Sequence, residues 1–348
     1  MMLVIPRGLY YYCHDSIGYF RLVIAILTMW MMIGMFTKNI VLEALRPYRG
    51  SHYLDMDINP EFRWISMLPG SPDEMEPSIL YVCFLSAAMR CNLENPGYYY
   101  LCIRDRFSED DEDAEALKGI FVINENHDTS WLYNVMQRRF IEISVWVKKM
   151  RIALIDYCDF QRLIDLSEPI LNNFVAILDS SHKLVAFSKN TECHNLINVS
   201  LVEKGFHTDQ VLKKLGETRR YEIYEQEQGV IISPPIESFA NYEAVTKTFH
   251  YGGEWLFLVA MECSITPLSP CIIDLFEIFT ENLYLCFINQ QRTHQSQLFA
   301  STLMEMLYEG LNNTFIIGER AKTANIPFYG YFNAYRMVFD DNSATVTS

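Results

Sequence analysis

Glycine-rich, metal-binding and nucleophile motifs are missing from this sequence of 348 residues. Its 15 glycines form neither G-x-G-x-x-G nor G-x-x-x-x-G-K-S/T, and it contains no H-E-x-x-H or G-x-S-x-G. Its nine cysteines include no C-x-x-C pair, and its eight histidines include no pair at helical ligand spacing. We therefore expect no catalysis, no metal and no cofactor.

Positive charge is also scarce. The chain has 28 Lys and Arg against 43 Asp and Glu, a formal net charge of -15, and the basic residues form no local cluster. Such a surface repels a phosphate backbone, which makes this chain a poor candidate for binding nucleic acid. Half of the residues are hydrophobic and 14% are aromatic, which rules out a disordered chain. At roughly 150 residues per domain, the length favours two or three domains.

No hydrophobic run is long enough to be a clear membrane span. The most hydrophobic, residues 22–36, has 15 residues without a charge. As a helix it spans about 22 Å, short of the roughly 30 Å hydrocarbon core. Residues 1–38 therefore form a hydrophobic extension with three interpretations: residues 1–34 are a leader before a true start at Met35, residues 20–36 are a marginal membrane anchor, or the run is an ordinary buried helix. If the run inserts in a membrane, the positive residues after it outnumber those before it, which predicts a cytoplasmic location for the rest of the chain.

Residues 39–128 read as a small α/β domain. The segments 79–84, 98–103 and 120–124 are short apolar runs rich in β-branched and aromatic residues, with a helix-like stretch between the first two. Alternation of buried strands with helices predicts a largely parallel sheet.

Residues 129–169 contain no glycine, and no proline before the last of them, and they read as one long connecting helix. Its apolar positions recur every three or four residues, as one stripe on a helix does. A helix of this length joins modules, and in a homodimer it lies against its copy. The residues assigned to this dimer helix are Leu132, Met136, Phe140, Ile143, Val147, Met150 and Leu154.

Residues 170–268 show the order hairpin, helices, hairpin. The first hairpin turns at 180–182, the helix-like stretches 196–205 and 208–216 follow, and the second hairpin turns at 252–253. With the long helix 269–311 after it, this is the order of PAS and GAF sensor domains. The overall class is therefore α+β, or mixed.

The inward faces of this sensor sheet are the best candidates for binding a small-molecule effector, although such faces are more often simply core. By the two-residue period, Phe174, Ala176 and Leu178 share one face of the first hairpin, and Trp255, Phe257, Val259 and Met261 share one face of the second. His207 stands at a break between helices and is either a ligand contact or a helix-start residue near solvent.

The segment 303–310, followed by Glu319-Arg320-Ala321 and Asn325-Ile326-Pro327, resembles PucR-type transcriptional regulators, the purine-catabolism and sugar-diacid regulator group. The resemblance covers roughly residues 75–340. It implies that 269–311 is a second long signalling helix and that 312–348 begins a degenerate GGDEF-like domain.

In that family a C-terminal helix-turn-helix contacts DNA, and this chain ends before one. The resemblance thus implies the sensory and dimerisation part of a cytoplasmic regulator, with a homodimer and a small-molecule effector as partners. The rival interpretation is a membrane-anchored sensor or adaptor that uses residues 20–36 as its anchor.

Overall fold

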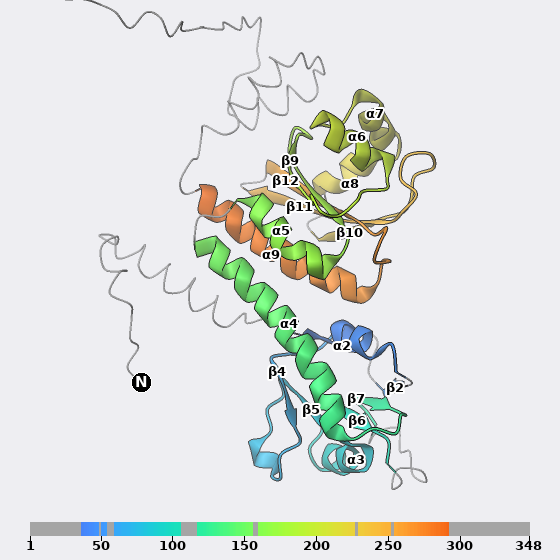
Figure 1. The fold of residues 1–348 in the computed structure, drawn as a ribbon, viewed down its shortest axis with the longest axis vertical. Coiled ribbons are helices and arrows are strands. Elements are labelled where there is room, and N and C mark those ends of the chain that lie inside the picture. The colour runs from blue at the N-terminus through green and yellow to red at the C-terminus, as the bar shows by residue number, and fades with distance from the viewer. Residues whose placement is uncertain are drawn as a thin grey trace, which may run out of the picture.

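The computed structural model describes residues 36–48, 50–53, 59–105, 117–155, 159–226, 229–251 and 254–291. Figure 1 shows two sheets joined by a layer of long helices. The expected leader or anchor up to residue 35, the second half of the signalling helix and the GGDEF-like segment lie outside the described residues. Within the described ranges, no helix is both long enough and apolar enough to cross a membrane.

The first sheet is mixed and has the order β2-β7-β6-β5-β4. Its neighbours β4, β5, β6 and β7 are parallel, and β2 adds an antiparallel edge. The strands are β2 (Gly50–Tyr53), β4 (Trp64–Met67), β5 (Ile79–Phe84), β6 (Tyr99–Ile103) and β7 (Ile120–Ile123). Helix α3 (Leu85–Glu94) connects β5 to β6. Because β6 and β7 are buried on both faces, their sequences are continuous apolar runs, and the expected largely parallel sheet is confirmed.

The residues on either side of β2, here called the N-terminal segment, pack on the helical layer. Strand β1 (Phe36–Thr37) pairs with β3 (Glu61–Phe62), and α2 (Lys38–Leu45) follows at once. Thr37 caps α2 by accepting a hydrogen bond from the backbone N–H of Ile40. A 3-10 turn, η2 (Pro72–Glu74), lies between β4 and β5.

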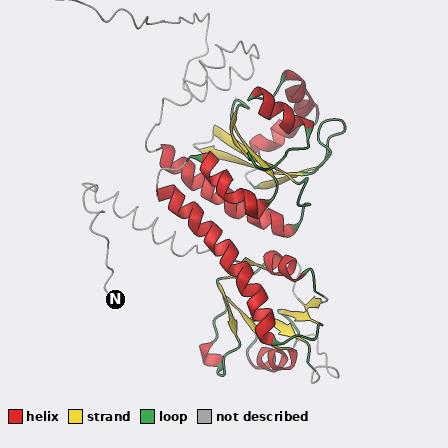
Figure 2. Ribbon diagram, viewed as in Figure 1, coloured by secondary structure: helices red, strands yellow, loops and turns green. Residues whose placement is uncertain are grey.

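The second sheet is antiparallel throughout and has the order β10-β11-β12-β8-β9. Its strands are β8 (Phe174–Asp179), β9 (Leu184–Phe187), β10 (Val230–Ser233), β11 (Ala244–Tyr251) and β12 (Glu254–Glu262). Helices α6 (Leu196–Lys204), α7 (Asp209–Glu217) and α8 (Arg220–Gln226) come between the two hairpins, and α9 (Pro270–Gln291) closes the unit. Helices α6–α8 lie on one side of the sheet and α9 lies on the other (Figure 2).

The single helix predicted over 129–169 is wrong, because the structure has two helices there. Helix α4 (Thr129–Ile155) ends, and α5 (Phe160–Leu171) begins where the Asp159 carboxylate accepts a hydrogen bond from the backbone N–H of Arg162. Helix α5 runs back along α4, as the 3.1 Å hydrogen bond from Trp146 Nε1 to Ser167 Oγ shows. No glycine or proline marks this break, which an aspartate cap makes instead.

The stripe assigned to the dimer helix is buried inside the chain. All seven of its residues, from Leu132 to Leu154, are at most 7% exposed. Along α4 they contact the first sheet at one end and α5 and α9 at the other. These residues therefore do not offer an open face to a second copy.

Hydrogen bonds also hold α9 against the N-terminal segment. The buried carboxylate of Asp274 on α9 accepts hydrogen bonds from Thr37 Oγ1, from Asn39 Nδ2 at 3.0 Å and from Asn59 Nδ2 at 3.3 Å. Nearby, the Phe36 ring stacks on Phe140 of α4 with 3.5 Å between centroids. One hydrophobic cluster therefore runs from the first sheet through the helices to the second sheet.

Another buried carboxylate attaches α6 to the antiparallel sheet. Glu262 at the end of β12 is 1% exposed and accepts hydrogen bonds from the backbone N–H groups of His194 (2.7 Å) and Asn195 (3.0 Å). The Asn198 side chain donates a third, at 2.7 Å. Removing this acceptor leaves buried donors without a partner.

We expect Glu262→Ala to lower the free energy of unfolding by about 3 kcal/mol, because hydrogen bonds to a charged acceptor are strong and their loss leaves unpaired donors. Urea denaturation measures this value. Glu222→Ala is the matched control, because the Glu222 side chain is 53% exposed and its ion pair with Arg219 is on the surface. Equal effects for the two variants would contradict the role given to Glu262.

Candidate functional site

The face of the antiparallel sheet beneath α6–α8 gathers most of the predicted ligand-binding residues. Phe174, Ala176 and Leu178 point to this face from β8 and are buried there with residues of α6, α8 and β12, namely Leu201, Tyr224 and Leu258. Trp255 packs against the same cluster. The middle of this face is filled by side chains.

Of the four residues predicted to share a face, Phe257, Val259 and Met261 do so, and only Trp255 lies on the opposite face. Phe257 pairs with Phe249 and Trp255 pairs with His250, so Leu256 is an extra residue in β12. Such a bulge turns the residues on its two sides to opposite faces. Phe257 and Val259 therefore belong to the other face, where the Phe257 ring lies 5.3 Å from that of Phe160 and 5.4 Å from that of Phe287.

His207 lies at one end of the site face, beside a histidine that sequence reasoning assigned only to a polar turn. His182 follows β8 in a tight turn, with a positive φ of 61°, and its carbonyl accepts a hydrogen bond from the backbone N–H of His207. The two ring centroids are 6.3 Å apart, and the Trp255 ring is 5.1 Å from that of His182. The polar sequence of this turn gave no sign that it would be buried.

Both imidazoles of this pair are neutral at pH 7. Burial lowers the pKa of His182 to about 3, with a further lowering from the charge of His207, and burial lowers the pKa of His207 to about 4. His207 Nδ1 and Trp255 Nε1 are buried and have no hydrogen-bond partner in the described part of the chain. Among these residues no group of three or more His, Cys, Asp or Glu is placed to hold a metal ion.

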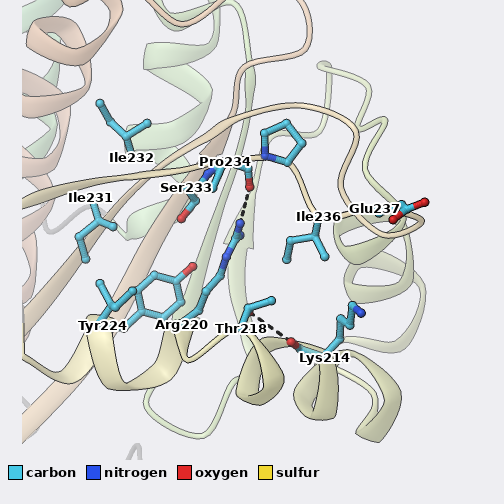
Figure 3. Close-up of a pocket in the computed structure, with 12 residues that line it drawn as sticks. Lys214, Thr218, Arg220, Tyr224, Ile231, Ile232, Ser233, Pro234, Ile236 and Glu237 are labelled. Carbon is cyan, nitrogen blue, oxygen red and sulfur yellow. Dashed lines mark hydrogen bonds between the residues drawn. The ribbon is translucent and has the colours of Figure 1, made fainter.

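A pocket of about 370 Å³ lies at the edge of the same face, between α7, α8, β10 and the loop after β10 (Figure 3). Tyr224 and Ile231 line it and also pack against the cluster of the site face. Arg220 reaches across it to the carbonyl oxygen of Pro234. Sequence reasoning missed this pocket, because no motif distinguishes its residues. The only signals are the adjacent prolines after β10 and the basic pair Arg219-Arg220 at the start of α8.

The neutral histidine pair predicts a loss of stability in acid. In the unfolded chain a histidine has a pKa near 6.5, so below that pH the unfolded state binds protons that the folded state excludes. Between pH 7 and pH 5 this costs about 2 kcal/mol for each buried histidine. The free energy of unfolding in urea, measured at pH 7 and pH 5, gives the decrease in stability. We expect His207→Gln to make this decrease smaller by about 2 kcal/mol.

His127→Gln is the control for this measurement, because the His127 side chain is exposed and stacks on Trp131 at the start of α4. We expect this variant to keep the decrease in stability that the two buried histidines cause, because it leaves both of them in place. If His207→Gln keeps it as well, His207 is not a neutral buried residue.

Comparisons with known proteins do not assign the chain to a family. No protein-family model matches it, and no curated protein matches it. The function must therefore be argued from the site face, the pocket beside it and the helices behind the sheet.

Proposed function

We propose that this chain is the sensory and dimerisation part of a cytoplasmic transcription regulator of the PucR type. The observation that carries the proposal is the layer of α4, α5 and α9, which packs against both sheets. Because these helices contact both sheets, a change in the packing of the antiparallel sheet moves helices that also contact the first sheet. No catalytic step is part of the proposal.

The antiparallel unit supports a PAS- or GAF-like sensor. Its first and last strands, β8 and β12, lie side by side, and a hairpin is completed on each side of them. The helices between the hairpins cover one face and leave a pocket at its edge. We consider two arrangements of the helices that are in equilibrium. An effector bound on this side shifts that equilibrium only if its contacts differ between the two arrangements.

Helix α9 is the element that we propose to carry the signal. It packs on β11 and α5 of the sensor unit, and its Asp274 accepts the hydrogen bonds from Thr37, Asn39 and Asn59 of the N-terminal segment. A small shift of α9 along its axis has to break or re-form these bonds. Contacts of this kind give discrete arrangements rather than continuous deformation.

A second copy of the chain is the proposed occupant of the open face of α4. Four apolar residues are exposed on that face by 43% or more: Ile141, Val145, Ile152 and Ile155. Their spacings of four, seven and three are nearly the same read from either end. A two-fold axis near the middle of α4 therefore places apolar residues against apolar residues of the copy.

We expect the chain to sediment as a dimer and Ile152→Glu to shift it toward monomer by tenfold or more in dissociation constant, because a carboxylate buried in an apolar contact is costly. Lys148 lies in the gap of the stripe, so like charges meet near the axis and added salt is expected to tighten the dimer. Sedimentation velocity over a range of concentrations measures both effects.

Leu93→Glu is the matched control, because Leu93 is 60% exposed at the end of α3, away from the stripe. It should leave the association unchanged. A clean monomer over a wide concentration range, or equal effects of the two variants, would count against dimerisation through this face.

A further inference from the structure

We propose that the pocket between α7, α8 and β10 binds a small carboxylate anion with an apolar body, and that Arg220 is the residue that holds the carboxylate. The inference rests on the proposed sensory function, because it names the chemical class of the effector. It is carried by a buried positive charge that the described residues do not neutralise.

Arg220 is 9% exposed, and the described residues supply no carboxylate that pairs with it. Within the described ranges, the hydrogen bond of its side chain runs from Nη2 to the carbonyl oxygen of Pro234. The preceding residue shows the contrast: the Arg219 side chain is 76% exposed and is paired with Glu222. The exposed arginine therefore has an acidic partner, whereas the buried one has none among the residues described.

The charge of Arg220 faces the pocket that this residue lines. The carbonyl dipole of Pro234 does not neutralise that charge, whereas an anion bound in the pocket would. A guanidinium has five N–H donors in a fixed plane, and the bond to Pro234 uses one of them. The remaining donors match the two oxygens of a carboxylate.

The walls of the pocket indicate the remainder of the ligand. Apolar side chains line it beside the ring of Tyr224, namely Ile223, Ile231, Ile232 and Ile236 with Pro234 and Pro235. Its volume of about 370 Å³ lies within the range of small-molecule sites. A carboxylate joined to a compact ring or a short alkyl chain therefore satisfies both parts of the site.

The other charged groups of the pocket favour a single negative charge. Lys214 lies 3.6 Å from the carboxylate of Glu217, which already compensates much of its charge. Figure 3 shows the Glu237 carboxylate directed away from Arg220. One uncompensated guanidinium suits a monoanion better than a phosphate dianion, which needs more positive charge around it.

The test titrates benzoate, cyclohexanecarboxylate and hexanoate into the full chain by isothermal calorimetry, with benzamide as the neutral counterpart of benzoate. We expect at least one carboxylate to bind, and we expect benzamide to bind at least about tenfold more weakly than benzoate, because it lacks the charge that Arg220 recognises. Inorganic phosphate, the dianion probe, should bind more weakly than the best carboxylate. This comparison uses the unaltered chain and does not depend on the folding of a variant.

Arg220→Gln is expected to lower the affinity for the best carboxylate by about 10- to 100-fold, and Arg219→Gln is expected to leave it within about twofold. Failure of all three carboxylates at millimolar concentration, or equal binding to Arg220→Gln, overturns the assignment of the pocket. Dimer formation by sedimentation is measured separately. Loss of carboxylate binding with an intact dimer rejects the pocket alone, whereas a monomer that still binds carboxylate rejects the dimer-based function alone.

Discussion

The buried face of α4 is the constraint on which the rest of the structure depends. Its apolar residues lie in one hydrophobic cluster with strands of the first sheet, with α5 and α9, and with strands of the second sheet. A helix with one face buried along its full length fixes the positions of the elements packed on that face, because close-packed interiors leave no room for sliding without loss of contacts. The two sheets therefore form one packed body rather than two units on a flexible linker.

Buried carboxylates and amides then fix the segments that apolar packing leaves free. Asp274 attaches α9 to the N-terminal segment, and Glu262 attaches the start of α6 to β12. Asn173, at 0% exposure before β8, accepts hydrogen bonds from the backbone N–H groups of Ile265 and Thr266 and so holds the chain that leads into α9. Hydrophobic burial is not directional, whereas these bonds specify one register.

The strands were predictable from sequence because their signal is local. Runs such as 79–84 and 120–123 are apolar at every position, as strands covered on both faces must be, and the two hairpins around the helices follow from turn chemistry. The break at Asp159 and the bulge at Leu256 were not predictable in this way. Each depends on a contact made after folding, and neither carries a glycine or proline to mark it.

The candidate site was predictable only where local periodicity sufficed. The alternation of β8 placed Phe174, Ala176 and Leu178 together, but nothing in the sequence distinguishes a filled face from a hollow one. Burial of His182 depends on the loop after α6 packing against its turn, and the Arg220 pocket depends on α7, α8 and the loop after β10 closing around it. Such juxtapositions of distant segments leave no pattern in any one of them.

Burial affects the charge of the histidine pair and the charge of Arg220 in different ways. The imidazoles of His182 and His207 respond to desolvation by losing their protons, so they stay buried as neutral groups. A guanidinium cannot respond in this way, because it stays protonated at any physiological pH. Arg220 therefore keeps its charge beside the pocket, where an anion can serve as its counter-ion. Binding of an anion beside Arg220 lowers the free energy of the folded state, and a sensor requires such a response to its effector.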